Sequence, residues 1–193
     1  MSNHDQKEYF SYLTSRSVFG SLYRKWWLYP KINKHLTGLT LDIGCGIGDM
    51  LAFRPGTVGT DINEHTVKFC AERGFVAELM QPDTLPFTDR KFDSVLLDNV
   101  LEHIENPIPL LGEISRVLKK GGKLVVGVPG TRGWRSDPDH KIEYCEDSLI
   151  NCLVDAGFEH LNTFFTPTHR SEWISKNIRQ YCIYATFSNR YSK

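Results

Sequence analysis

The sequence contains no run of about 18 apolar residues, which a membrane-spanning helix would require. The polar segment 1–8 lacks the apolar core of a secretion signal, so we expect a cytoplasmic protein. The five cysteines are odd in number and form no C-x-x-C pair, which argues against a disulfide framework. Dense acidic or Cys/His clusters are also missing from the sequence, and we therefore predict no bound metal.

Positive and negative charges balance over the whole chain but are unevenly distributed. Residues 1–36 hold six Lys/Arg against two Asp/Glu, residues 37–165 hold 12 against 20, and residues 166–193 hold five against one. The basic ends are either ordinary solvated faces or segments that meet in the fold and attract an anionic substrate or a membrane surface. A length of 193 residues suits one domain with a small appendage.

Residues 1–36 are predicted to form an N-terminal helical cap, because apolar and aromatic side chains recur at spacings of three and four. The aromatic-dense segment 26–29 precedes Pro30, which should interrupt the helical pattern. The cap either packs its aromatic side chains on the main domain or forms a lid or an interfacial element.

Residues 37–193 are predicted to form the main domain. Strands are expected at 39–43, 56–60, 75–79, 92–97, 123–128, 158–166 and 178–187, and helices at 47–53, 64–73, 107–119 and 145–156. Segments 80–91 and 129–143 read as loops. Strands that alternate with helices are typical of a parallel α/β sheet, whose ligands bind at the carboxyl ends of the strands.

The segment 41–48 carries the strongest pattern of the chain, with Asp42 followed by Gly44, Gly46 and Gly48. An apolar strand, a tight glycine turn and the start of a helix would present free N–H groups to a ligand. A dinucleotide fingerprint requires G-x-G-x-x-G, and Asp49 occupies its third glycine position here. The pattern is therefore D-x-G-x-G-x-G.

Asp61 follows the second predicted strand, and its carboxylate could accept hydrogen bonds from the two vicinal hydroxyls of a ribose. The alternative is that Asp61 caps the next helix, although Asn63 could serve as the cap instead. Met80 and Gln81 follow the third strand and Asp98 ends the fourth. Met80 is expected either against a ligand or in the core.

Together with Asp61, the Leu-Pro-Phe segment 85–87 and the Asn-Val-Leu-Glu-His segment 99–103, the glycine pattern resembles class I S-adenosylmethionine-dependent methyltransferases of the type 11, quinone-biosynthesis-like group. The resemblance implies a Rossmann-like, doubly wound sheet of seven strands with the last antiparallel. It also implies S-adenosyl-L-methionine as the cofactor, held by Asp42, Gly44, Cys45, Gly46, Gly48, Asp61, Ile62, Met80, Gln81 and Asp98.

The implied reaction is methylation, and we predict O-methylation of a small-molecule, glycan or lipid-linked acceptor, with peripheral membrane contact as an option. His140 is the first candidate for a general base, with Tyr144 and His103 behind it. Nucleic-acid bases are disfavoured as acceptors, because no Pro-Pro motif follows the fourth strand and no cysteine follows Pro129. The alternatives are an RNA methyltransferase that uses the basic ends and a non-catalytic nucleotide-binding module.

Overall fold

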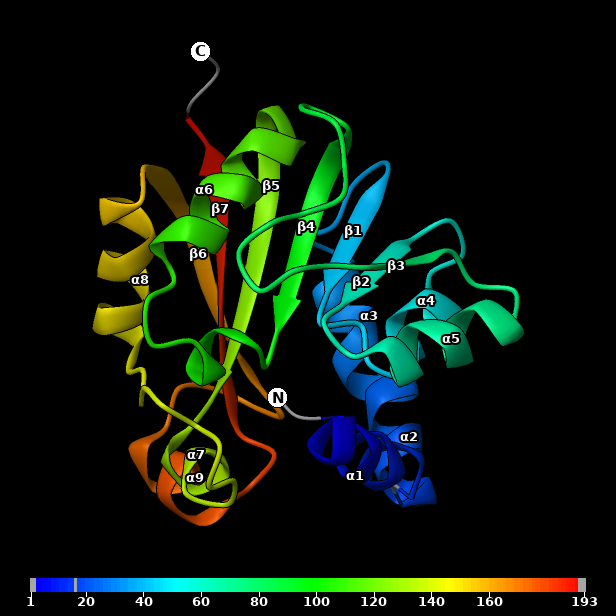
Figure 1. Ribbon diagram of the computed structural model, residues 1–193. Coiled ribbons are helices and arrows are strands. Elements are labelled where there is room, and N and C mark those ends of the chain that lie inside the picture. Colours follow the sequence, from blue (N-terminus) through cyan, green and yellow to red (C-terminus); the bar gives the residue numbers. More distant parts are fainter. Residues whose placement is uncertain (1–2, 16, 191–193) are drawn as a thin grey trace.

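A computed structural model describes residues 3–15 and 17–190, so residues 1, 2 and 16 of the predicted cap lie outside the described part. Its centre is a seven-stranded sheet of order β3-β2-β1-β4-β5-β7-β6 (Figure 1). The strands are β1 (Thr40–Ile43), β2 (Val58–Asp61), β3 (Ala77–Leu79), β4 (Phe92–Asp98), β5 (Leu118–Pro129), β6 (Phe158–Thr166) and β7 (Cys182–Asn189).

Neighbouring strands from β3 to β5 pair in parallel, whereas β7 pairs antiparallel with both β5 and β6. The strand order and the antiparallel last strand confirm the predicted doubly wound, Rossmann-like methyltransferase sheet. The order reverses between β1 and β4, where an open α/β sheet forms its ligand crevice.

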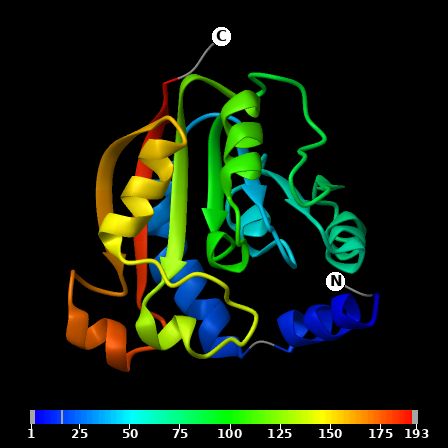
Figure 2. The same cartoon turned by 60° about the vertical axis from the view of Figure 1, so that its left-hand side comes forward.

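The main-domain helices are α4 (Asp49–Phe53), α5 (Glu64–Glu72), the 3₁₀ turn η2 (Leu101–His103), α6 (Ile108–Val117), α7 (Thr131–Trp134), α8 (Glu146–Asp155) and α9 (Glu172–Asn177). Figure 2 shows α6 and α8 side by side on one face of the sheet, and the first N-terminal helix beyond the carboxyl ends of the strands. None of the helices in the described residues is long and apolar enough to cross a bilayer.

Successive side chains of β4 point to opposite faces of the sheet, so that this strand contributes to a hydrophobic core on each face. Val95 and Leu97 pack with α6 and α8, whereas Leu96 between them packs with the cap residues Tyr29 and Ile32 on the opposite face. All five side chains are buried. Because both faces are covered, the strand is apolar almost throughout, as expected for a central parallel strand.

The cap consists of α1 (Asn3–Thr14), α2 (Val18–Tyr23), the π-helix η1 (Arg24–Leu28) and α3 (Tyr29–Asn33). Pro30 stands in the first turn of α3, where its missing N–H costs no helical hydrogen bond. Trp27 Nε1 and Lys31 Nζ donate to the carbonyl of Pro167 at 2.7 and 2.9 Å. The cap therefore contacts the C-terminal segment, and the two basic ends of the chain lie together.

Three predicted boundaries were wrong. The segment 129–143 contains the short helix α7 and is not only a loop, and β5 begins at Leu118, where it pairs with Phe92 before a register shift. The last strand begins at Cys182, because α9 occupies the preceding segment. Ser171 caps α9 by accepting from the Ile174 N–H, a local signal that the sequence analysis did not use.

Candidate active site

A cavity of about 510 Å³ lies at the carboxyl ends of β1 and β4, where the strand order reverses. The cap closes one side of it, and α7 with the following loop closes another. In Figure 1 the parallel strands point toward the end of the molecule that carries α1, α2 and α7. The predicted residues that line this cavity are Asp42, Gly44, Cys45, Gly46, Asp98, His103 and His140.

The glycine turn takes the left-handed backbone conformation that its sequence predicts. Gly44, Gly46 and Gly48 have φ angles of 72°, 53° and 80°. Gly44 also has no room for a side chain, because a Cβ there would lie 2.5 Å from Val100 Cγ2. The Gly44 N–H donates to the Thr60 carbonyl at 2.8 Å, which fixes the turn against β2.

Asp61 braces this turn from the end of β2. Its Oδ2 accepts from the Gly46 N–H and its Oδ1 from the Asn63 N–H, both at 2.9 Å. Burial raises the pKa of Asp61, and these backbone hydrogen bonds oppose the rise. Asn63, not Asp61, caps α5 through the His65 N–H. A carboxylate offers about four acceptor positions, so Asp61 keeps capacity for ligand hydroxyls.

Two further carboxyl groups stand at the strand ends inside the cavity. Asp98 Oδ1 accepts from the Tyr184 hydroxyl at 2.6 Å and from Asn99 Nδ2 at 2.8 Å. Asp42 is buried, and burial raises its pKa well above the usual range, assisted by the negative charges of Asp98 and Asp61. Carboxyl groups so close together favour a cationic ligand group between them.

The remaining predicted cofactor residues lie outside the described lining of this cavity. Gly48 is the N-cap of α4, and Ile62 and Gln81 are exposed beyond the ends of β2 and β3. Met80 is buried in the main core. The structure thus gathers the first glycines of the turn and Asp98 in one cavity, whereas Gly48, Ile62, Met80 and Gln81 do not line it.

The two histidines predicted as catalytic candidates meet on the opposite wall of the cavity. Their rings lie 4.6 Å apart at 65°. His140 Nδ1 is 2.7 Å from the Trp134 carbonyl, and its Nε2 is 3.8 Å from Glu102 Oε1. Burial lowers the pKa of His103, assisted by the nearby His140. Burial raises the pKa of Glu102 to about 8.

Tyr144, the third catalytic candidate, lies elsewhere. Its side chain packs in the main core, where burial raises the pKa of its hydroxyl and the Cys152 thiol adds to the rise. We therefore do not carry Tyr144 into the proposed chemistry.

The charged groups of the cavity that sequence reasoning missed include Glu102 and Arg24. Glu102 precedes His103 in segment 99–103, which contributed to the resemblance, but its burial depends on the loop that carries His140. Arg24 Nη1 is buried without a hydrogen-bond partner among the described residues, and it lies 4.0 Å from Asp49 Oδ2. The position of Arg24 beside Asp49 of α4 could not be inferred from local sequence.

Comparison with known proteins finds similarity to methyltransferases. A family model described as a methyltransferase domain matches residues 41–126. A protein of Methanocaldococcus jannaschii described as uncharacterized is 36% identical over 98 residues, which are 50% of this chain and 48% of that protein. The tRNA (carboxymethyluridine(34)-5-O)-methyltransferase alkbh8 of Xenopus tropicalis is 31% identical over 58% of this chain and 19% of its own length.

The chain spans about half the length, or less, of the first curated relatives that it matches. Among solved structures, a SAM-dependent methyltransferase of Thermotoga maritima, described as a possible histamine N-methyltransferase, has a TM-score of 0.77 at 17% identity. That likeness covers 97% of this chain and 100% of the other, and at such identity it concerns the fold alone. The family match over residues 41–126, the fold and the glycine turn agree with the predicted class I, type 11 methyltransferase, a group whose cofactor is S-adenosylmethionine.

Proposed function

We propose that the protein transfers a methyl group from S-adenosylmethionine to a hydroxyl oxygen of an anionic small molecule, glycan or lipid-linked acceptor. The observation that carries this proposal is the continuous cavity that joins the glycine turn to the wall bearing His103 and His140. A cofactor and an acceptor held on these two sides would meet without crossing bulk water, which favours alignment of the reacting atoms.

The residues of the cavity fit the charged end of such a cofactor. Arg24 Nη1 offers a buried donor for a carboxylate, and the Asp42 carboxyl group suits an ammonium group. Asp61 retains acceptor positions for ribose hydroxyls beside the same turn. When bound, the cofactor supplies a methyl group that is already activated on a sulfonium sulfur.

The protein would mainly orient the acceptor and receive its proton. The acceptor oxygen forms a bond to the methyl carbon, the C–S bond breaks, and its electron pair stays on sulfur. The hydroxyl proton leaves to a group of the cavity wall, for which His140 is our first candidate and His103 the second. The Trp134 carbonyl orients the His140 ring, as a base of this kind requires.

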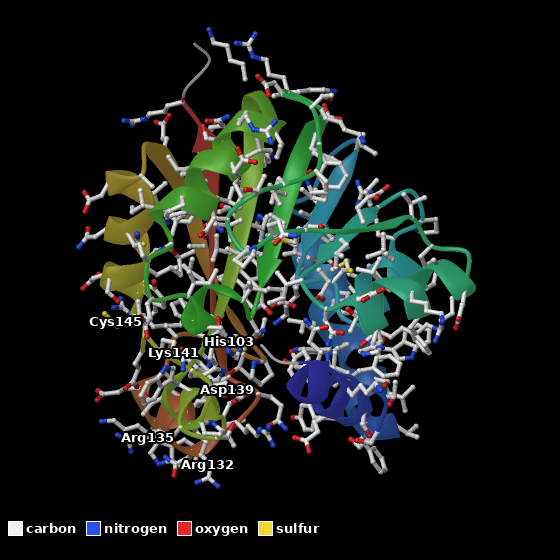
Figure 3. The ribbon with its side chains drawn as sticks, in the orientation of Figure 1. His103, Arg132, Arg135, Asp139, Lys141 and Cys145 are labelled. Carbon is white, nitrogen blue, oxygen red and sulfur yellow. The ribbon has the colours of Figure 1, made fainter. Side chains whose placement is uncertain are left out.

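A cluster of cations supports an anionic acceptor. A second cavity, of about 390 Å³, is lined by Arg132, Arg135, Lys176 and Arg179, and Arg179 also lines the larger cavity. Figure 3 shows Arg132 and Arg135 at the same end of the molecule as His103. A phosphate or carboxylate seated among these cations would lie next to the proposed acceptor position.

An exposed apolar surface on the cap supports a lipid-linked acceptor. Phe19 and Val18 are 85% and 73% exposed, and Trp26 is 70% exposed beside Lys25. Aromatic side chains next to cations suit the headgroup region of a membrane. This surface belongs to the same cap that closes the cavity, so a membrane-bound acceptor would have a short path to it.

Methylation of RNA remains the second candidate, because several relatives are named as tRNA methyltransferases. The pairing of the basic ends speaks against it. Arg170 lies 3.1 Å from Glu146, and Arg24 lines the cavity. Cations neutralised or buried in this way add little to the attraction of a polyphosphate backbone.

Calorimetry with S-adenosylmethionine tests the cofactor assignment through Arg24→Ala. We expect the affinity to fall at least about tenfold, because a charge-assisted hydrogen bond contributes roughly 1.5–3 kcal/mol. Lys25→Ala is the matched control, since it removes an exposed cation from the next position of the same helix and should leave the affinity unchanged. Equal affinities of Arg24→Ala and the parent protein would remove Arg24 from the site.

The acceptor is sought by radiolabelled methyl transfer into cell extract fractionated into soluble anionic metabolites, lipids and RNA. Label in the metabolite or lipid fraction, with reduced incorporation by the Arg132→Ala/Arg135→Ala double variant, would support the proposal. Label confined to RNA, with an RNA affinity that falls steeply with salt, would favour the second candidate. No binding of the cofactor at millimolar concentration would overturn the enzymatic function as a whole.

A further inference from the structure

The Glu102 side chain is buried without a partner. The residue is 1% exposed, and neither carboxyl oxygen has a hydrogen-bond partner among the described residues. Its backbone carbonyl accepts from the Lys141 and Ile142 N–H groups at 2.7 and 3.1 Å, which fixes the residue against the loop after α7. Burying a carboxyl group without a partner is unfavourable, so such a group in a cavity wall points to a missing ligand.

Two imidazole rings face this carboxyl group. Together with one carboxyl oxygen of Glu102, one ring nitrogen from each of His103 and His140 forms a set of three atoms that all lie within 4.8 Å of one another. Figure 3 shows His103 near the loop residues Asp139 and Lys141, at the carboxyl end of the sheet. Sequence spacing does not reveal this cluster, because His140 approaches Glu102 and His103 only in the folded chain.

Backbone carbonyls orient both rings. A carbonyl can only accept, so His140 Nδ1, at 2.7 Å from the Trp134 oxygen, carries the proton and Nε2 keeps its lone pair. Nε2 is the atom that lies 3.8 Å from Glu102 Oε1. The main chain of Asp139 is likewise a hydrogen-bond partner of the His103 ring. Metal-binding histidines are usually oriented in this way by the second ring nitrogen.

We infer that Glu102, His103 and His140 bind a divalent transition-metal ion at the acceptor side of the cavity. An ion about 2.0–2.2 Å from each ligand atom would hold these atoms roughly 3–4 Å apart. His140 Nε2 and Glu102 Oε1 lie 3.8 Å apart, inside this range, and the other two separations are at most 4.8 Å. Small side-chain rotations would therefore complete the site, without any change of the backbone.

The donor set selects the class of metal. Two imidazole nitrogens and one carboxylate oxygen suit Zn²⁺, Fe²⁺, Co²⁺ or Mn²⁺, whereas Mg²⁺ and Ca²⁺ prefer sites made entirely of oxygen. Three protein ligands leave further coordination positions open, as in catalytic metal sites. Asp137 lies close to the cluster, with Oδ2 3.9 Å from His140 Nε2, but its other oxygen accepts from the Asp139 N–H.

This inference rests on the proposed function for its role in catalysis. The open positions would face the cavity and bind the acceptor hydroxyl with a neighbouring oxygen, as in a vicinal diol or a hydroxy acid. An ion held there would supply Lewis-acid stabilisation of the deprotonated hydroxyl, whose proton would leave to water. The same oxygen would then form the bond to the methyl carbon while the C–S bond breaks. In this arrangement His140 is a ligand and does not serve as the base.

Metal binding is measured on the full chain without an affinity tag, with Co²⁺ as the probe and visible absorption and equilibrium dialysis as readouts. We expect one ion per chain, displaced by Zn²⁺ and retained in excess Mg²⁺. Glu102→Gln and His140→Ala should each weaken Co²⁺ binding at least about tenfold, since even outer-shell changes at metal sites cost 10–100-fold. His160→Ala, which removes a histidine outside the cavity, should bind like the parent protein.

Thermal melting and calorimetry with S-adenosylmethionine accompany each variant, so that a folding defect is not mistaken for loss of a ligand. Stoichiometric Co²⁺ binding that survives both Glu102→Gln and His140→Ala would overturn the inference, as would no Co²⁺ binding by the parent protein. Displacement by Mg²⁺ as readily as by Zn²⁺ would overturn the metal class. Cofactor binding without Co²⁺ binding leaves the proposed function standing, whereas Co²⁺ binding without cofactor binding removes the proposed function and retains the metal site.

Discussion

The two walls of the cavity are built in different ways. The wall at the end of β1 is one continuous segment, in which Asp42, Gly44 and Gly46 follow one another along the chain. The opposite wall combines residues of η2, the loop after α7 and the approach to β7. A continuous turn can be recognised from its own sequence, whereas an assembled wall can be recognised only after the fold has brought its parts together.

We expect the largest effect from a substitution that removes the support of the continuous wall. In Asp61→Ala the buried N–H groups of Gly46 and Asn63 lose their acceptor, which should lower the free energy of unfolding by about 2–4 kcal/mol. The affinity for S-adenosylmethionine should fall about 100-fold, if the carboxylate also meets the ribose. Denaturant titration and calorimetry measure the two quantities separately. A destabilised variant with unchanged cofactor affinity would restrict Asp61 to bracing the turn.

A smaller quantity, the difference in stability between two glycine variants, separates the cost of backbone conformation from the cost of close packing. Gly44 and Gly56 both have positive φ, but an added Cβ meets Val100 at 2.5 Å only at position 44. Gly56→Ala should therefore cost about 1–2 kcal/mol from strain alone. Gly44→Ala should cost about 1–3 kcal/mol more, because the Val100 side chain must also move.

Urea unfolding of both glycine variants gives this difference directly. The double variant Gly44→Ala/Val100→Ala should cancel part of the additional loss, since it removes the obstructing methyl groups. Equal destabilisation by Gly44→Ala and Gly56→Ala would show that close packing at Val100 contributes nothing.

The smallest expected effect concerns the rim between the two walls. Arg179 Nη2 donates to the Tyr12 hydroxyl at 3.2 Å, and both side chains are exposed. Tyr12→Phe should change the free energy of unfolding by less than about 0.5 kcal/mol and accelerate cofactor release a few-fold. Stopped-flow measurement of cofactor release tests this effect. An unchanged release rate in Tyr12→Phe would show that the Arg179–Tyr12 hydrogen bond does not slow cofactor release.

The difference between the walls also explains what the sequence could predict. The strands of the sheet and the glycine turn followed from local patterns, because strand periodicity and positive φ are properties of short segments, whereas the antiparallel last strand was implied by the family resemblance. The Glu102–His103–His140 cluster and the entry of Arg24 into the cavity depend on packing between distant segments. Helix α9 was hidden for a different reason, since its six residues are too few to show a helical period.

Helix α1 is attached to the main domain near both ligand positions. The carbonyl of Gln6 accepts from Asn63 Nδ2 at 2.8 Å, two residues after Asp61, and Tyr12 reaches Arg179 in the cation cluster. The next residue, Leu13, would lie 3.4 Å from a Cβ at Gly46. One short helix thus contacts both the glycine turn proposed for the cofactor and the cations proposed for the acceptor. We expect occupancy of either side to alter the affinity of the other, with equal coupling in both directions.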